Sequence, residues 1–131
     1  MPDVLTRDFR NVRVFLVEDE FLMASTLQED LEAEGFQVFG PYPTLALAQA
    51  AIDVDRYDVA IIDVNLRGQL SYPIADELMR RNVPLIILTG FALRDLPDRF
   101  RKVLKLSKPY NLAATLRAVD KVLGGKPAAP P

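Results

Sequence analysis

The sequence contains neither cysteine nor histidine among its 131 residues. Without cysteine the chain forms no disulfide and no thiolate metal site, and without histidine it has no imidazole ligand and no histidine-dependent catalytic triad. Any chemistry that the chain performs must therefore use carboxylates, hydroxyls and amines.

Long apolar runs and an excess of either charge are also missing. No apolar run approaches the roughly 18 residues of a membrane-spanning helix, and the N-terminus lacks the apolar segment of a signal peptide. We therefore expect a cytoplasmic protein that does not enter a membrane. Sixteen Lys and Arg against eighteen Asp and Glu leave a net charge of −2, so composition gives no reason to expect binding to nucleic acid.

The residues that are present predict one α/β domain in which strands and helices alternate five times. Half of the residues are apolar, which suits a globular domain of this length. Continuous apolar runs read as buried strands, and the segments between them carry the apolar spacing of helices. Such a pattern predicts an open, doubly wound parallel sheet with helices on both faces. The expected strands are residues 12–17, 37–39, 58–63, 84–88 and 103–106.

Four predicted helices have recognisable ends or apolar stripes. Ala24, Leu27 and Leu31 form the first stripe, and Thr44 is positioned to cap the second helix. Ser71 and Pro73 open a third helix, and Leu112 begins the last. The interval between the fourth and fifth strands is short and contains a proline. We expect only one or two helical turns near residues 96–101, or a mobile segment.

Chemically distinctive side chains follow four of the predicted strands. They are Glu18 with Asp19, Asp63, Thr89 and Lys108. Open α/β sheets place their sites outside the carboxyl ends of the strands, so we expect these side chains to meet. Three neighbouring carboxylates repel one another unless a cation lies between them, and hard oxygen ligands suit Mg²⁺. A carboxylate beside Mg²⁺ can attack a phosphoryl group, while a cationic side chain and a hydroxyl stabilise the oxygens of the transferring group.

Each of these residues alone has an ordinary structural explanation. A lone Asp at a strand end is usually a helix cap, a lone Lys a solvated charge and a lone Thr a turn residue. Four such positions at four strand ends of one sheet favour a functional site.

These motifs resemble the receiver domain of bacterial two-component response regulators, over residues 11–123. The resemblance implies a flavodoxin-like fold with strand order 2-1-3-4-5. Outside the matching residues we expect a short lead over 1–10 and, from its biased composition, a disordered Pro-rich tail over 124–131. It implies that Asp63 accepts a phosphoryl group from a histidine of a partner kinase. Thr89 would hydrogen-bond the phosphoryl group, and Lys108 would form an ion pair with it. The resemblance also implies that the Lys108–Pro109 peptide is cis.

The same resemblance implies a set of Mg²⁺ ligands. Asp19 and Asp63 would bind the ion directly, Glu18 would act mainly through water, and Asn65 would contribute its backbone carbonyl.

A narrower resemblance points to stand-alone receivers with a Phe-Ala-Thr-Gly-Tyr-type motif, associated with histidine kinases of the HWE class. Here the motif reads Ile87-Leu88-Thr89-Gly90-Phe91. Three residues depart from the common receiver pattern: Glu18 in the acidic pair, Gly90 after the Thr, and Lys105 where a switch aromatic is frequent. The last departure suggests that output passes through an order change between Phe91 and Arg101. Phe91, Leu93 and Phe100 either form a partner surface or seal the sheet.

The expected function is that of a single-domain response regulator which signals or relays by protein contact. Its partner would be a sensor histidine kinase or a histidine phosphotransfer protein. It would not be an enzyme beyond catalysing its own phosphorylation and dephosphorylation. If the chain is complete, no output domain is fused to it.

Other functional classes remain open at this point. A phosphorylation-independent binding module would keep the fold and bind Mg²⁺ without phosphoryl uptake. A phosphatase with an Asp nucleophile is disfavoured because no cap domain covers the site. A flavodoxin-like cofactor binder is weaker still, since the acidic residues after the first strand would repel phosphate.

Overall fold

A computed structural model of the chain describes residues 7–90 and 96–124. Its main sheet has five strands in the order β2-β1-β3-β6-β7, and each neighbouring pair is parallel. Counted along the chain, this is the predicted order 2-1-3-4-5. The strands are β1 (Arg13–Val17), β2 (Gln37–Tyr42), β3 (Val59–Asp63), β6 (Leu85–Thr89) and β7 (Leu104–Ser107).

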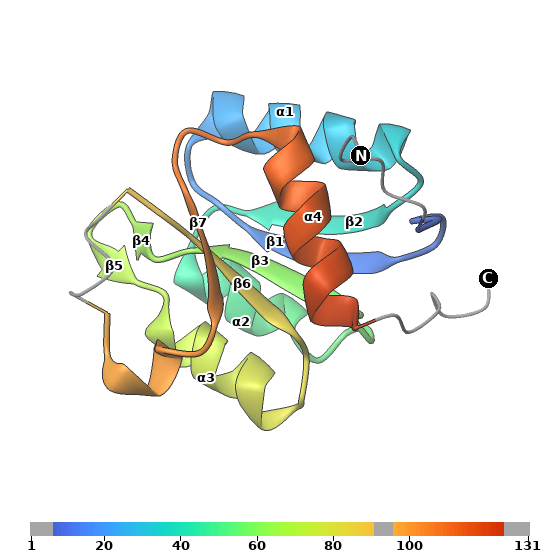
Figure 1. The fold of residues 1–131 in the computed structure, drawn as a ribbon. Coiled ribbons are helices and arrows are strands. Elements are labelled where there is room, and N and C mark those ends of the chain that lie inside the picture. The colour runs from blue at the N-terminus through green and yellow to red at the C-terminus, as the bar shows by residue number, and fades with distance from the viewer. Residues whose placement is uncertain (1–6, 91–95, 125–131) are drawn as a thin grey trace.

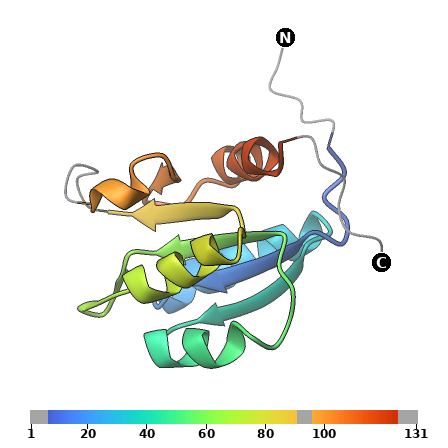
Figure 2. The ribbon, with the colours of Figure 1, turned by 90° about the horizontal axis from the view of Figure 1, so that it is seen from below.

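Helices cover both faces of the sheet, as Figures 1 and 2 show. On one face lie α1 (Phe21–Ala33) and α4 (Leu112–Leu123), and on the other α2 (Leu45–Ala51) and α3 (Tyr72–Arg80). Strand side chains alternate between the two layers: Val14 and Leu16 pack toward α1 and α4, whereas Phe15 and Val17 pack toward α2 and α3. Each layer forms its own apolar cluster, which explains why the strands are apolar throughout.

The predicted helix signals are confirmed. Ala24, Leu27 and Leu31 are the buried residues of α1. Thr44 caps α2 by accepting a hydrogen bond on its hydroxyl from the backbone N–H of Leu47, at 3.1 Å. The last helix ends at Gly124, which adopts the left-handed conformation that glycine tolerates.

The second strand is longer than predicted, because it continues through the Gly-Pro sequence that reads as a turn. Gly40 has a φ of +111°, and a Cβ at this position would lie 2.4 Å from the carbonyl oxygen of Leu16. The pairing of β1 with β2 shifts register between Phe15 and Val17. Glycine therefore lets this strand bend against β1 and still remain in the sheet.

A two-stranded hairpin, not expected from the sequence, follows β3. It pairs β4 (Asn65–Leu66) with β5 (Gln69–Leu70) in antiparallel fashion. Arg67 and Gly68 form its turn, both with positive φ. The hairpin lies just beyond the end of β3, beside the edge of the sheet that carries the polar residues (Figure 1).

The connection between β6 and β7 is short, as expected. Its described part contains one 3-10 turn, η2 (Asp98–Phe100), instead of a full helix. Phe100 is fully buried against Tyr72 of α3, with ring centroids 5.4 Å apart. Phe100 therefore seals the sheet, whereas Phe91, Leu93 and the first part of the proposed order change lie outside the described residues.

Candidate phosphorylation site

The polar residues predicted to form a site all lie at the carboxyl edge of the sheet. Glu18 and Asp19 follow β1 directly, Asp63 ends β3, Thr89 ends β6 and Lys108 follows β7. Asp63 pairs in register with Leu88, so Thr89 is the next residue along the neighbouring strand. Parallel pairing thus brings together residues that are far apart in the sequence.

Three carboxylates form the acidic part of this site. One oxygen each from Glu18, Asp19 and Asp63 lies within 4.8 Å of the others. Glu18 and Asp63 are only 1% and 4% exposed, whereas Asp19 is partly exposed. Asn65 follows on β4 and donates its backbone N–H to Asp63 Oδ1 at 3.3 Å.

Lys108 brings one positive charge to the two buried carboxylates. Its Nζ lies 2.9 Å from Asp63 Oδ2 and 3.2 Å from Glu18 Oε1. The backbone N–H of Lys108 donates to the carbonyl of Thr89 at 3.0 Å, which ties the end of β7 to the end of β6. The peptide from Lys108 to Pro109 is cis, in agreement with the expectation from the resemblance.

Burial makes ionisation of both carboxyls costly. Burial raises the pKa of Glu18 to about 7, although the N–H of Glu20 donates to it and the charge of Lys108 opposes the rise. Burial also raises the pKa of Asp63, against the hydrogen bond from Lys108. Burial lowers the pKa of Lys108, but its contacts with Asp63 and Glu18 outweigh that effect and the net pKa is raised. One cation therefore does not fully balance this site.

The donor set fits a small divalent cation. Glu18 Oε1 is buried and has no hydrogen-bond donor in the described part of the chain, although it faces Lys108. Carboxylate oxygens are hard ligands of the kind that Mg²⁺ prefers, and Asp19, the partly exposed member of the group, lies at its solvent side. The acidic group is thus suited to Mg²⁺.

Two contacts of the site were not anticipated from the sequence. The buried Ser71 hydroxyl donates to the backbone carbonyl of Asp63 at 2.6 Å, so Ser71 braces the end of β3 and does not cap α3 with its side chain. The Arg67 guanidinium lies 3.6 Å from Asp19 Oδ2, at the mouth of the site. The first contact joins the end of β3 to the residue after the hairpin, and the second joins the residues after β1 to the hairpin turn. Sequence periodicity predicts neither contact, because it does not predict the hairpin.

Lys105 has a clear structural place, although it stands where receivers often carry an aromatic residue. Its Nζ donates to three backbone carbonyls, those of Phe100, Arg101 and Val103, at 2.6 to 2.9 Å. Lys105 therefore ties β7 to the end of η2.

Comparisons with known proteins agree with this geometry. The solution structure of SdrG from Sphingomonas melonis Fr1 is 33% identical, with a TM-score of 0.69, and the match covers 86% of this chain and 97% of SdrG. The BeF3-activated conformation of SdrG from Pseudomonas melonis Fr1 is 32% identical, with a TM-score of 0.73, over 91% of this chain and 99% of that one. No protein-family model matches the chain.

One relative found by sequence comparison is a longer protein than this chain. The transcriptional regulatory protein PdtaR of Mycobacterium tuberculosis is 29% identical over 112 residues, which are 82% of this chain and 55% of PdtaR. The chain thus spans about half the length of this relative. In the described residues, no helix is long and apolar enough to cross a membrane.

The sheet order, the acidic site and the likeness to SdrG over nearly the whole of that protein agree with one another. On these grounds, the chain belongs to the receiver domains of two-component response regulators.

Proposed function

We propose that the chain is a single-domain response regulator that accepts a phosphoryl group on Asp63 in an Mg²⁺-dependent reaction. The observation that carries this proposal is the juxtaposition of Asp63 with a second buried carboxylate and a lysine. Asp63 Oδ2 lies 2.9 Å from Lys108 Nζ, and Glu18 and Asp19 complete an acidic group around the same point. Residues 11–123 would form the functional unit.

The reaction is a displacement at phosphorus. A carboxylate oxygen of Asp63 forms the new P–O bond, and the bond from phosphorus to the donor breaks, with its electron pair leaving on the donor nitrogen of a phosphohistidine or the oxygen of an acyl phosphate. Lys108 and the Thr89 hydroxyl would stabilise the phosphoryl oxygens by charge and hydrogen bonding. Glu18, Asp19, Asp63 and the Asn65 carbonyl would hold Mg²⁺, which when bound supplies positive charge to the transferring group.

The donor would be a sensor histidine kinase, of the HWE class by motif resemblance, or a histidine phosphotransfer protein. Phe21 and Leu22 begin α1 right after the acidic residues, and they are 76% and 77% exposed. A groove of about 540 Å³ runs from Leu22 to Lys108 and Tyr110. An apolar surface beside the phosphoacceptor suits a protein donor that must bring its histidine to Asp63.

The test is intact-mass spectrometry after incubation with Mg²⁺ and acetyl phosphate. The proposal expects one phosphoryl adduct that requires Mg²⁺, disappears on chelation and is absent from Asp63→Asn. Asp58→Asn is a matched control, because Asp58 lies at the opposite end of β3, where its carboxylate accepts from the backbone N–H of Arg13.

A phosphorylation-independent binding module is the alternative function. It gains support if wild type gives no adduct and beryllofluoride, a phosphoryl mimic, also fails to bind in the presence of Mg²⁺. Binding of beryllofluoride without an adduct would instead indicate fast hydrolysis of the phosphorylated protein.

A further inference from the structure

A second cation, Arg67, lies at the mouth of the acidic site, and the proposed function does not use it. Arg67 Nε lies 3.6 Å from Asp19 Oδ2, and one terminal nitrogen of its guanidinium lies 3.5 Å from the backbone carbonyl oxygen of Asp19. A carboxylate oxygen of Asp19 in turn lies within 4.8 Å of oxygens of Glu18 and Asp63. One carboxylate group therefore separates the guanidinium from the proposed phosphoacceptor.

The β4–β5 hairpin positions Arg67 beside the site. Arg67 and Gly68 form its turn, with φ angles of +54° and +89°, and the side-chain oxygen of Asn65 accepts from the backbone N–H of Gly68 at 2.5 Å. A left-handed conformation is uncommon for a residue other than glycine. Asn65 also donates its backbone N–H to Asp63, so the turn that carries Arg67 is joined directly to the end of β3 (Figure 1).

The side chain of Arg67 is exposed enough to exchange one anion for another. It is 78% exposed, whereas the side chain of Asp19 is only 13% exposed. An exposed ion pair contributes little free energy, so a second anion can replace the first at low cost. Arg67 lies on the solvent side of the site, which is the side from which a phosphoryl donor must approach the buried Asp63.

The charge of the site gives a second cation a role once Asp63 is phosphorylated. When ionised, the three carboxylates carry three negative charges, and Mg²⁺ together with Lys108 would supply three positive charges. Phosphorylation would replace the single charge of the Asp63 carboxylate by a phosphoryl group with about two negative charges. One negative charge is then left without a counter-charge at the mouth of the site, beside Arg67.

We propose that Arg67 is a phosphoryl-binding residue that exchanges Asp19 for the phosphoryl group. In the free protein, Arg67 pairs with Asp19 and competes with Mg²⁺ for this carboxylate. Once Asp19 binds Mg²⁺, the guanidinium is released and pairs with phosphoryl oxygens on Asp63. This inference rests on the proposed phosphorylation of Asp63 and adds to it a contact from the hairpin.

Two titrations of the full chain, followed by amide NMR signals, test the proposal. The first uses Mg²⁺ alone, and the second uses beryllofluoride at saturating Mg²⁺, because beryllofluoride adds one negative charge at Asp63 as a phosphoryl group does. The variants are Arg67→Gln, which removes the charge, and Arg67→Lys, which keeps it. Arg56→Gln is the matched control, since Arg56 is an exposed arginine before β3, at the opposite end of the sheet.

The proposal expects opposite changes in the two titrations of Arg67→Gln. Mg²⁺ should bind roughly twofold to fivefold more tightly, because no guanidinium competes for Asp19. Beryllofluoride should bind roughly fivefold more weakly, because its added charge loses a partner. Arg67→Lys and Arg56→Gln should stay within about twofold of wild type in both titrations. A loss of folding cannot give this pattern, since it would weaken both ligands.

Several results would overturn the proposal. They are an unchanged affinity of Arg67→Gln for either ligand, weaker binding of both ligands, and a loss of beryllofluoride binding in Arg67→Lys as large as that in Arg67→Gln. Each of these leaves the proposed function intact, because wild type still binds beryllofluoride. If wild type forms no phosphoryl adduct and binds no beryllofluoride, the proposed function itself is wrong, and the inference about Arg67 is wrong with it.

Discussion

At the scale of single residues, the most unfavourable electrostatic interaction at the site is between the buried carboxylates of Glu18 and Asp63. Both carboxyls are nearly inaccessible to water, and Lys108 is the one lysine in contact with them in the described residues. Burial and mutual repulsion favour a proton on one of them, and a divalent cation would remove that preference. We therefore expect the site to be sensitive to both pH and Mg²⁺.

Without Mg²⁺, the stability of the domain is expected to fall as pH rises from about 4.5 to 7. In this window Glu18, with its pKa raised from 4.5 to about 7, keeps its proton in the folded state and loses it in the unfolded state. The folded state then binds more protons, so the free energy of unfolding decreases with pH, by at most about 3 kcal/mol. Urea unfolding across this pH range measures the effect.

The variant Glu18→Gln should lose most of this pH dependence. Glu20→Gln is the matched control, because Glu20 is exposed and its side chain makes no capping hydrogen bond. If the two variants show the same slope of stability against pH, the explanation based on Glu18 is wrong.

At the scale of elements, much of the fold and the site was predictable from the sequence. Apolar runs placed the five main strands, and polar residues at their ends placed the acidic site, because parallel strands end at one edge. The β4–β5 hairpin was missed because strands of two residues have no periodicity. The contact of Ser71 with the Asp63 carbonyl was missed because it depends on how that hairpin returns to the sheet.

The bend of β2 depends on Gly40, and Gly40→Ala is expected to destabilise the domain by roughly 3 kcal/mol or more. The added Cβ would lie 2.4 Å from the Leu16 carbonyl, at a φ of +111°. Gly68→Ala is the control, since Gly68 also has a positive φ but no atom lies within 4 Å of its added Cβ. Equal losses of stability in chemical denaturation would rule out the close approach as the cause.

Lys105 is expected to order the end of η2 through its three carbonyl contacts. Lys105→Met keeps the apolar stem but removes the donors, so it should cost about 1 to 2 kcal/mol and speed amide exchange at residues 100–103. Lys102→Met changes a neighbouring exposed lysine and should alter neither quantity. Unchanged exchange in Lys105→Met would mean that the lysine does not hold this turn.

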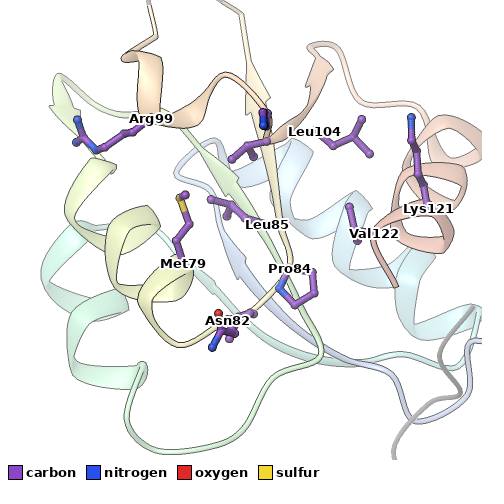
Figure 3. A pocket seen from close by; sticks show the side chains of 11 residues that line it. Met79, Asn82, Pro84, Leu85, Arg99, Leu104, Lys121 and Val122 are labelled. Carbon is purple, nitrogen blue, oxygen red and sulfur yellow. The ribbon is translucent and has the colours of Figure 1, made fainter. Parts of the chain in front are cut away.

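At the scale of the whole molecule, opposite ends of one sheet present two different surfaces. The carboxyl edge carries the acidic group with the exposed apolar residues Phe21 and Leu22 beside it, and the other end carries a groove between Met79 of α3 and Lys121 of α4 (Figure 3). The proposed docking of the donor at Phe21 and Leu22 can be tested separately from the proposed chemistry at Asp63, because the two apolar side chains are exposed and the carboxyl is buried.

Phe21→Ser/Leu22→Ser is expected to slow phosphoryl transfer from a phosphorylated kinase or phosphotransfer protein by roughly tenfold, since it removes apolar docking contact. Uptake from acetyl phosphate should stay unchanged, because this small donor needs no such surface. Leu47→Ser/Val54→Ser makes equivalent changes at exposed positions on or just after α2. A matching loss with both donors would show that the pair supports the site itself.

The central claim, phosphoryl uptake by Asp63, is tested most directly by borohydride trapping after incubation with acetyl phosphate and Mg²⁺. Borohydride reduces an aspartyl phosphate to homoserine, and tandem mass spectrometry then identifies the altered position. The account predicts homoserine at position 63 only, dependent on Mg²⁺. Homoserine at position 19 or another carboxylate, with Asp63 unmodified, would contradict it.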